Sequence, residues 1–278
     1  MKRNLTVLLL LCISVIRMDA QVNVITDDDV KQGTSCDQMK FCINYKMTFV
    51  NDTMRKPYVI NTEPMLLEIG NKVSLFYSDA CSKSDSVNSE IMKRGERTFV
   101  CYGNISWRLY RGYPNTDTNT LLDKIGMERF AVTEKAEEPS WKICSDSTTT
   151  LLGYICHLAI ARFKGRLWSA WYTDEISMSS GPWLLYGLPG LVLKAYDTER
   201  QYTFEADGMR QIKDLDIYYK GEKYESIDRK ALNDIYRQYY ADPVGYVTNN
   251  PSLKVTVTDK NGNPTRGRMN IPYNSIER

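Results

Sequence analysis

The 278-residue chain lacks the residues and motifs on which many common chemistries depend. His157 is its only histidine, which excludes most histidine-based catalysis and metal sites built from several histidines. The sequence has no C-x-x-C pair, so nothing favours a zinc site. It also has no P-loop, dinucleotide-binding fingerprint, EF-hand loop or H-E-x-x-H motif. His157 also follows Cys156 directly in an expected strand, so the two side chains point to opposite faces and form no dyad. We therefore expect no metal and no cofactor, and the sequence identifies no catalytic residue.

The sequence also lacks a large excess of basic or acidic residues. The formal net charge is +2, but residues 1–20 hold Lys2, Arg3 and Arg17 against Asp19, and the remaining chain has 33 basic and 33 acidic residues. Basic and acidic residues are interspersed, so there is no basic stripe to attract nucleic acid, and we expect no nucleic acid partner. With 42% hydrophobic and 25% charged residues, the composition is that of a folded globular protein.

Long apolar runs are missing as well. The longest, Leu5–Ile16, is shorter than the roughly 20 residues that a membrane-spanning helix needs. It follows a basic pair, Lys2-Arg3, and it precedes Met18-Asp19-Ala20 and then Gln21. This order is typical of a secretory signal peptide. We predict that residues 1–20 are cleaved near Ala20, that the chain is exported, and that no transmembrane segment remains after signal removal.

Cysteine is present in a number that suits an exported chain. Loss of Cys12 with the signal peptide leaves six residues, Cys36, Cys42, Cys81, Cys101, Cys144 and Cys156. An even number predicts disulfides, although six cysteines allow 15 pairings. The spacing favours Cys144 with Cys156 across neighbouring strands and Cys36 with Cys42 in a short loop, which leaves Cys81 with Cys101. Free thiols are the alternative, because a chain of this size can fold without disulfides.

Between Cys42 and Asp207 the chain consists of short β-branched or aromatic runs separated by turn residues, which predicts antiparallel β structure. The expected strands are Tyr45–Val50, Met65–Ile69, Lys72–Tyr77, Thr98–Tyr102, Ser106–Tyr110, Arg129–Thr133, Trp141–Cys144, Gly153–Phe163, Arg166–Thr173, Gly190–Tyr196 and Tyr202–Ala206. Gly70-Asn71 and Lys164-Gly165 have the spacing and residue types of hairpin turns. The polar stretch Asp79–Arg97 predicts a loop or short helix.

One amphipathic helix is expected near the C-terminus. Asp228 can cap its first turn, and Asp242-Pro243 ends it. One face of this helix carries an apolar stripe, formed by Leu232, Ile235, Tyr236, Tyr239 and Tyr240. A sheet of about ten strands must curl or split to protect its edges. We therefore predict an α+β fold, mainly antiparallel β, in which a curved sheet or half-open barrel has the C-terminal helix packed on it.

A motif-rich segment spans Trp168–Tyr196. Its centre, Gly187-Leu188-Pro189-Gly190-Leu191-Val192, resembles the GLPGLI family of Bacteroidetes envelope proteins. Further matching motifs lie around it, namely Trp141-Lys142-Ile143, Gly153-Tyr154-x-Cys156, Phe163-x-Gly165-Arg166, Ala170-Trp171-Tyr172-Thr173, Gly181-Pro182-Trp183, Tyr196-Asp197, Ile227-Asp228-Arg229 and Tyr239-Tyr240-x-Asp242-Pro243. The chain departs from the pattern at Val192, where the name has isoleucine, and at Ser177, where proline is usual. The resemblance implies a location in the periplasm or at the outer-membrane periphery, but no activity.

The resemblance and the composition together predict four segments. Residues 1–20 are the signal peptide, and residues 21–44 are an N-terminal lead that contains cysteine. Residues 45–245 form the β-rich domain that resembles the GLPGLI family. Residues 246–278, which are polar and rich in Asn and Pro, are expected to be a loosely ordered tail.

The GLPGLV segment predicts a tight, proline-stiffened turn, because its glycines allow positive φ and its proline fixes φ. Two interpretations are open. The turn either places aromatic side chains as a plug inside the sheet, or forms the rim of a groove that binds a ligand or partner. The residues concerned are Trp168, Trp171, Trp183, Tyr186, Gly187, Leu188, Pro189 and Gly190.

Three functions follow as hypotheses. The first is a non-enzymatic envelope protein that binds an envelope protein, a peptide or a lipid-like ligand, with a role as an accessory to outer-membrane transport or envelope assembly as one form of this hypothesis. The second is a periplasmic enzyme that depends on the carboxylates Asp174, Glu175 and Asp197, with Asp207 nearby across the sheet; gathering of these acids in one pocket would favour it. The third is a structural module that pairs with a partner through an exposed sheet edge.

Overall fold

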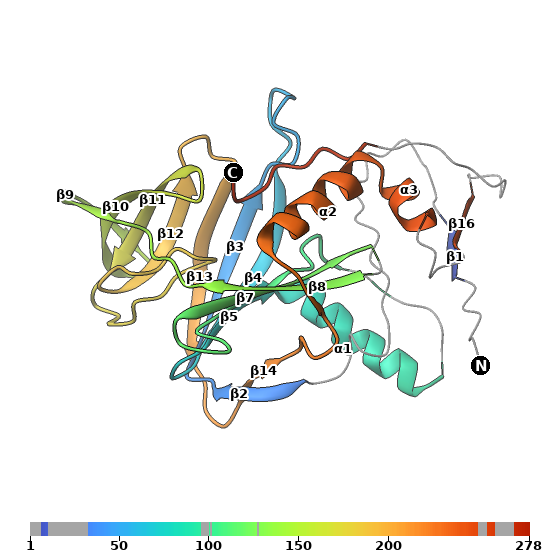
Figure 1. The fold of residues 1–278 in the computed structure, drawn as a ribbon. Coiled ribbons are helices and arrows are strands. Elements are labelled where there is room, and N and C mark those ends of the chain that lie inside the picture. Colours follow the sequence, from blue (N-terminus) through green and yellow to red (C-terminus); the bar gives the residue numbers. More distant parts are fainter. Residues whose placement is uncertain are drawn as a thin grey trace.

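One large curved sheet dominates the structure, which is a computed structural model describing residues 7–10, 33–95, 100, 102–126, 128–249, 255–258 and 270–278. Its twelve strands follow the order β15-β8-β7-β6-β5-β4-β3-β13-β12-β11-β10-β9. Neighbouring strands are antiparallel except β15, which pairs parallel with β8. The sheet curves without closing, and a C-terminal helix packs beside it (Figure 1). The predicted α+β fold, mainly antiparallel and half open, is confirmed.

The strands of this sheet are β3 (Phe41–Phe49), β4 (Asn61–Ile69), β5 (Ser74–Ser78), β6 (Arg108–Arg111), β7 (Thr118–Ile125), β8 (Glu128–Lys135), β9 (Lys142–Leu151), β10 (Tyr154–Phe163), β11 (Arg166–Thr173), β12 (Leu191–Asp197), β13 (Tyr202–Gln211) and β15 (Glu225–Ser226). Two small sheets pair β2 (Thr34–Gln38) with β14 (Asp216–Tyr219) and β1 (Val7–Leu10) with β16 (Val255–Thr258). The helices are α1 (Asp79–Lys93), α2 (Arg229–Ala241) and α3 (Pro243–Thr248). No described helix combines the length and apolarity that a membrane crossing needs.

Both predicted hairpins form. Lys164 and Gly165 take positive φ between β10 and β11, as a type I′ turn requires. The turn between β4 and β5 is longer than the two residues expected, because Ile69 pairs with Ser74. The Asp37 carboxylate explains this length, since it accepts hydrogen bonds from the backbone N–H groups of Lys72 and Val73 at 2.6 and 2.9 Å.

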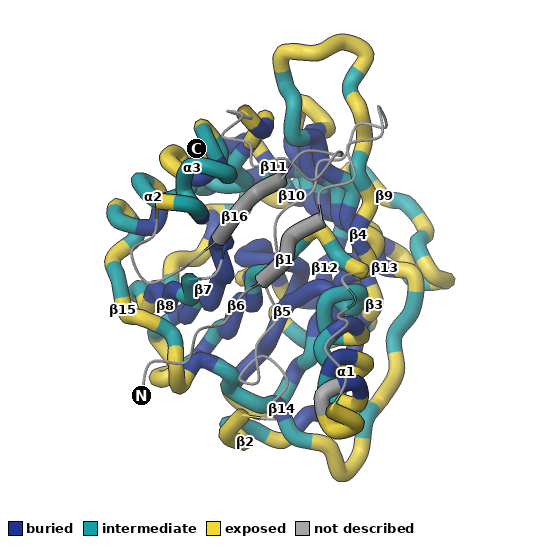
Figure 2. Tube along the Cα trace, turned by 90° about the vertical axis from the view of Figure 1, so that its right-hand side faces the viewer, coloured by how far each residue is buried: buried dark blue, intermediate teal, exposed yellow. Residues whose placement is uncertain are grey.

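A single apolar cluster fills the inner face of the sheet. The cluster joins Tyr45 of β3 and Phe76 of β5 to Trp168 of β11 and Phe204 of β13. Strands several positions apart in the sheet therefore contribute to one core, and the sheet curves around it. The segment 181–190, which we call the plug, lies within this cluster and connects β11 to β12. Figure 2 shows the central strands buried and the loop between β3 and β4 exposed at the top.

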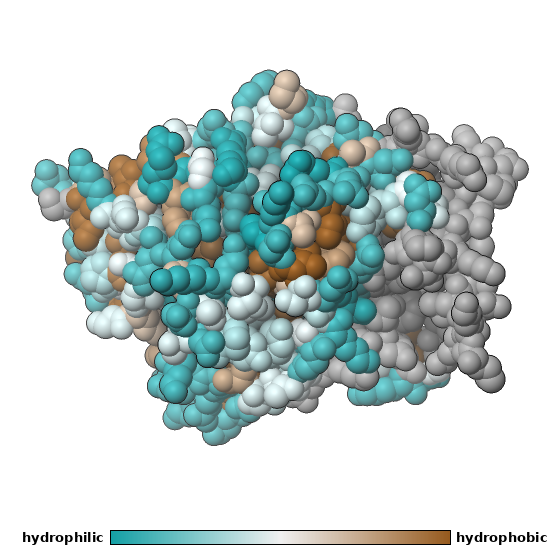
Figure 3. All heavy atoms as spheres, viewed as in Figure 1, coloured by the Kyte–Doolittle hydropathy of each residue, from teal (hydrophilic) through white to brown (hydrophobic). Residues whose placement is uncertain are grey.

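A second apolar cluster lies on the outer face and includes Leu75, Tyr110 and Leu122. The small sheet of β2 and β14 covers it, with Ile217 of β14 buried. A third cluster joins Phe130 of β8 to Leu232 of α2. Apolar side chains gather just below α2 in Figure 3, and hydrophilic ones surround them. The amphipathic stripe of α2 is therefore a packing face, and its cap is as predicted: the Asp228 carboxylate accepts from the Ala231 N–H at 2.7 Å.

The last nine residues, 270–278, run back across the open side of the sheet, and we call them the strap (Figure 1). The buried Arg166 guanidinium holds the strap by donating to the carbonyl oxygens of Ser275 and Ile276 and to the Asn274 side chain. The strap thus differs from the loosely ordered tail expected over 246–278. Sequence patterns missed it because its partners, such as Arg166 and Tyr202, are distant in the chain.

Several strands also differ from expectation. The pattern did not predict β7, because polar residues such as Asn119, Asp123 and Lys124 are buried in it. β9 extends to Leu151 rather than ending at Cys144, with residues 145–147 bulged out of the pairing with β10. The expected strand Thr98–Tyr102 lies largely outside the described residues, as does most of the predicted signal peptide.

Candidate functional site

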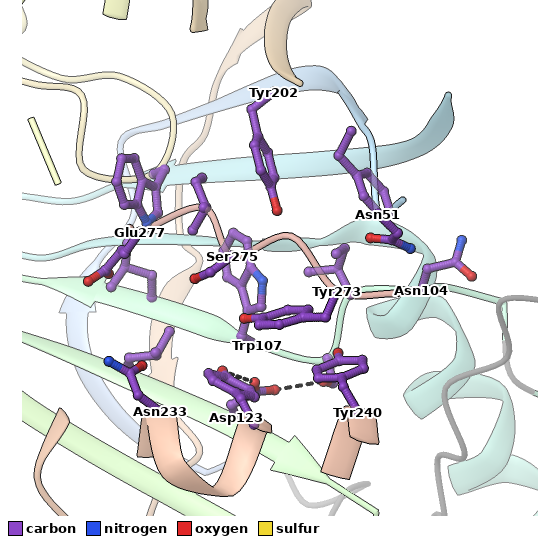
Figure 4. A pocket seen from close by; sticks show the side chains of 18 of the residues that line it. Asn51, Asn104, Trp107, Asp123, Tyr202, Asn233, Tyr240, Tyr273, Ser275 and Glu277 are labelled. Atoms are coloured by element: carbon purple, nitrogen blue, oxygen red, sulfur yellow. Dashed lines mark hydrogen bonds between the residues drawn. The ribbon is translucent and has the colours of Figure 1, made fainter. Parts of the chain in front are cut away.

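A cavity of about 100 Å³ lies where the plug, the sheet and α2 meet. Met47 and Phe49 of β3 form one wall, and residues of β6 and β7 form the floor. α2 and the strap cover it from the open side of the sheet. Figure 4 shows Tyr202 approaching from one side and Asp123 and Tyr240 from the other, with Tyr273 between them. The cavity is therefore built from segments far apart in sequence.

Asp123 is the buried acid of this cavity. Strand alternation in β7 turns Leu121, Asp123 and Ile125 toward α2, while Leu122 packs in the outer cluster. Its Oδ1 accepts from the Ser106 hydroxyl at 2.6 Å and from the Lys124 N–H at 2.7 Å. Its Oδ2 accepts from the Tyr236 hydroxyl. A carboxylate offers about four lone-pair sites, so Asp123 can accept one further donor.

Aromatic rings surround the carboxyl. Tyr236 and Tyr240 lie one helical turn apart on α2 and face the sheet. The Tyr240 ring stacks on Tyr273 of the strap, with centroids 4.1 Å apart and planes within 5°. Trp107 and Tyr202 complete the walls. The Tyr202 hydroxyl donates to the Asn274 carbonyl at 2.5 Å, so the strap and the aromatic wall are fixed together.

One base lines the cavity. Arg229 begins α2, and its guanidinium donates to the Glu134 carboxylate of β8. Its Nη1 lies 3.6 Å from Glu277 of the strap. Burial alone would lower the pKa of Arg229, but the two carboxylates raise it. Arg229 is therefore held as a cation by acids on both sides.

Burial raises the pKa of the two acids that line the cavity. For Asp123, the hydrogen bonds from Ser106 and Tyr236 oppose this rise of the pKa without cancelling it. For Glu277, burial is again the main cause of the raised pKa, and Arg229 opposes it. Burial and the nearby Asp123 also raise the pKa of Tyr236 well above its usual value, so its phenol stays protonated and donates. In both acids, the hydrogen bonds and nearby positive charge do not fully offset the cost of burying the charged carboxylate.

The structure divides the residues singled out in the GLPGLV region. Trp168, Trp183, Tyr186 and Leu188 are buried together in the inner cluster. The Trp183 ring lies 5.6 Å from Trp168 and also lines the cavity. Trp183 has a φ of +53°, which is rare for a bulky residue, so its neighbours hold it in a strained conformation.

The other residues of that region have different places. Trp171 is half-buried and Gly187 and Pro189 are exposed. At Gly190, a Cβ atom would lie 1.9 Å from the Thr173 carbonyl oxygen, so β11 approaches too closely for any side chain. Of the eight residues singled out, only Trp183 lines the cavity.

Polar contacts fix the plug in place. The Tyr186 hydroxyl donates to the Glu137 carbonyl at 3.1 Å, and the Trp141 indole N–H donates to the Tyr186 carbonyl at 2.7 Å. The Arg111 guanidinium lies over the Tyr186 ring, 4.3 Å from its centroid. These contacts give Tyr186 a role in holding the crossover, and Tyr186 does not line the cavity.

The carboxylates of the enzyme hypothesis do not come together. Asp197 is buried and pairs with Arg166 at 2.7 Å. Asp174 and Glu175 are exposed at the end of β11, where Glu175 accepts from the Ile155 N–H, and Asp207 is exposed on β13. None of them lines the cavity. In the described part of the chain, no three His, Cys, Asp or Glu side chains gather to hold a metal ion.

The predicted disulfides are not seen. Cys36, Cys42, Cys144 and Cys156 are free thiols. The bulge in β9 places Cys144 opposite Leu158 and Cys156 opposite Thr149, so the two cysteines are not cross-strand partners. Cys36 and Cys42 belong to strands of different sheets. Cys81 donates to the Ile105 carbonyl, and Cys101 lies outside the described residues.

Sequence reasoning missed most of the cavity. Asp123 and Ser106 were not singled out, because isolated polar residues in or near a strand are usually solvated. The tyrosines of α2 were assigned to packing, which is correct for Tyr239 but omits the cavity that Tyr236 and Tyr240 line. The one available signal was Asp123 itself, an acid that directly follows the apolar pair Leu121-Leu122.

Comparison with known proteins gives a short match and a distant one. The profile of a family described as "Protein of unknown function (Porph_ging)" matches residues 164–194, which include the β10–β11 turn and the plug. This fits the GLPGLI resemblance over that stretch, a small part of the chain. No curated protein matches.

Among solved structures, two crystal forms of PNGF-II are similar, each with a TM-score of 0.49 and 17% identity. The similarity covers 73% of this chain and 34% or 33% of theirs. The chain therefore spans about a third of the length of the structures it matches.

Proposed function

We propose that the chain is an exported envelope protein, in the periplasm or at the outer-membrane periphery, that binds a small ligand in the cavity beneath α2 without transforming it. The observation that carries this proposal is the buried Asp123 carboxyl, which faces a space walled by aromatic rings. Aromatic walls with a few fixed polar groups are typical of small-molecule sites. The basic and apolar N-terminal residues support export.

The size of the cavity limits the size of the ligand. Sites for drug-sized molecules measure roughly 300–1,000 Å³, so a space of about 100 Å³ suits a small molecule or the head group of a larger one. A whole acyl chain or peptide does not fit inside. We therefore place the ligand site in the cavity and not at the rim formed by the GLPGLV segment. Trp183 is the residue that belongs to both the earlier candidates and the cavity lining.

The test is to block the cavity without disturbing the core. Asn233 is an exposed residue of α2 that lines the cavity, so Asn233→Phe adds a ring there. Arg237 lies one turn further along the same helix, is exposed and does not line the cavity, so Arg237→Phe is the matched control. Each protein is purified from the cells that make it, and bound small molecules are identified by native mass spectrometry.

We expect one small molecule to accompany the wild type and Arg237→Phe at near-stoichiometric amounts and to be lost from Asn233→Phe. Equal retention by both variants, or no bound molecule in any preparation, would contradict the proposal. Sequencing the N-terminus of the mature envelope fraction tests export, since we expect it to begin at Gln21.

A second candidate function is strand pairing at the edge of β9. β9 is the last strand in the sheet order, so among the described residues no strand pairs with its outer side. The three-residue bulge shortens the regular edge but leaves residues 148–151 and 142–144 extended. Amide exchange over residues 142–151 tests this function: slower exchange in envelope extracts than in purified protein supports it, and equal rates contradict it.

A further inference from the structure

The cavity beneath α2 has more acid than base. Asp123 and Glu277 line it together with a single base, Arg229. That base already contacts Glu134 and Glu277, and among the described residues Asp123 makes no ion pair. If all four groups are charged, the local balance is two negative charges. The site therefore lacks positive charge next to Asp123.

The walls of the cavity suit a cation. Trp107, Tyr202, Tyr240 and Tyr273 present aromatic rings to the space above the Asp123 carboxyl (Figure 4). The faces of such rings attract cations, most strongly where water is excluded. One ring of this wall already contacts a cation, because the Arg166 guanidinium carbon lies 4.8 Å from the Tyr202 centroid. A carboxylate combined with aromatic faces is the arrangement that recognises ammonium groups.

The dimensions of the cavity set the size of the group. About 100 Å³ is somewhat less than the cavity of roughly 150 Å³ that accommodates benzene in an engineered protein. A trimethylammonium or primary alkylammonium group is of this size. The exposed amides of Asn104 and Asn233 line the same cavity, where they can hydrogen-bond a polar extension of the ligand.

Other ligand classes fit less well. An anion would approach both Asp123 and Glu277, and Arg229, the only base among the described lining residues, is already paired. A neutral apolar group would fill the space but would leave the buried Asp123 carboxyl without a counter-charge. We propose that the cavity selects a small organic cation, an alkylammonium group held between Asp123 and the aromatic rings. This inference rests on the proposed function and names its ligand class.

The test compares two probes of one shape. Choline carries the charged trimethylammonium head, and 3,3-dimethylbutan-1-ol is its neutral carbon counterpart. Binding of each is measured by titration calorimetry at pH 7.5. We expect choline to bind the wild type at least about tenfold more tightly, as a desolvated cation–π contact and a carboxylate both contribute. We expect Asp123→Asn to reduce this difference to the part that the aromatic rings supply and Arg237→Phe to preserve it in full.

A second variant is used if Asp123→Asn does not fold normally. If Asp123→Asn does not give a wild-type melting profile, Tyr240→Leu removes an aromatic face and keeps the carboxyl, and choline binding should again fall about tenfold. Binding of choline should also weaken as the pH falls and Asp123 is protonated; Ser106, Tyr236 and Arg229 are the side chains that face it.

The outcomes separate the two proposals. Equal affinity for choline and the neutral alcohol, with both lost in Asn233→Phe, overturns the cation preference but leaves the ligand-binding function intact. A native ligand that is neutral or anionic also overturns the cation preference and leaves the ligand-binding function intact. If neither probe binds and no native ligand accompanies the protein, both proposals fail.

Discussion

The half of the sheet formed by β10–β13 is filled by its own crossover, whereas the half formed by β6–β8 is covered by α2 and the strap. The plug is covalently part of the strand connection, and its rings pack against Trp168 and Phe163. α2 and the strap approach from distant parts of the chain and leave a cavity over Asp123. The two halves share one sheet but differ in how completely apolar groups fill it.

The two halves also differ in how a buried carboxylate is compensated. In the plugged half, the buried charge of Asp197 has a direct partner in Arg166. In the covered half, Asp123 has only neutral hydrogen-bond donors at contact distance. Removing one partner of a buried, paired charge destabilises a fold, while a carboxyl without a counter-charge is a group that a ligand can complete.

The largest effect is expected at the plug. Gly190→Ala would place a Cβ atom 1.9 Å from the Thr173 carbonyl oxygen, where Thr173 pairs with Leu191. The two strands must separate to accept it, so we expect a loss of more than about 4 kcal/mol in the free energy of unfolding, or no folded protein. Urea denaturation followed by tryptophan fluorescence measures this loss.

Gly187→Ala is the matched control within the same motif. Gly187 has a φ of +89°, but its added Cβ would meet only the flexible Glu138 side chain at 3.2 Å. We expect a cost of about 1–2 kcal/mol from backbone strain alone. Similar losses for the two glycines would show that close strand approach is not what the motif provides.

The next largest effect is expected at Arg166, which ties the strap to the plugged half. Arg166→Gln leaves Asp197 buried without its counter-charge and removes the donors to Ser275 and Ile276. We expect a loss of about 3–5 kcal/mol, with faster amide exchange throughout residues 270–278. Arg162→Gln, on the exposed face of β10, should change stability by less than about 0.5 kcal/mol. Unchanged exchange in the strap would show that other contacts hold it.

How far the sequence predicts these features depends on whether the determining contacts are local. The type I′ turn at Lys164-Gly165 and the cap at Asp228 are set by neighbouring residues, and both were predicted. The alternating strands predicted the antiparallel sheet for the same reason, and the number of strands predicted its curvature. Trp183 and Leu188 were singled out, and their motif suggested two roles without deciding between them.

The cavity depends instead on contacts between distant segments. Asp123 meets Tyr236 across 113 residues, and Arg166 meets Asn274 across 108. No period or spacing in the sequence encodes such meetings. β7 was missed because its buried Asp123 and Lys124 interrupt the apolar pattern, and the same residues make it part of the site.

A moderate effect, visible as pH dependence, is expected at Asp123. Burial raises its pKa in the folded state above the unfolded value near 4, so the folded state binds the proton more tightly. The stabilising contribution of this protonated form is complete at low pH and is lost as the pH rises through the folded pKa. Asp123→Asn should therefore remove part of the decline in stability above pH 4.

Other groups contribute to the same decline. Glu63, Glu68 and Glu277 also have pKa values raised by burial, so the informative quantity is the difference between wild type and variant across pH. Chemical denaturation at pH 4, 6 and 8 gives this difference. A pH-independent difference would mean that Asp123 has the same affinity for protons in both states, contrary to its burial.

The smallest effect is expected at the start of α2. Asp228→Ala removes the carboxylate that accepts from the Ala231 N–H at 2.7 Å, and a lost N-cap costs about 1 kcal/mol. Asp228→Asn keeps an acceptor and should cost only a few tenths. Because the cap belongs to α2 and not to the plug, amide exchange should increase in α2 and remain unchanged in β12. If exchange in β12 increases equally, the covered half and the plugged half unfold as one unit, and α2 does not form a separately mobile cover over the cavity.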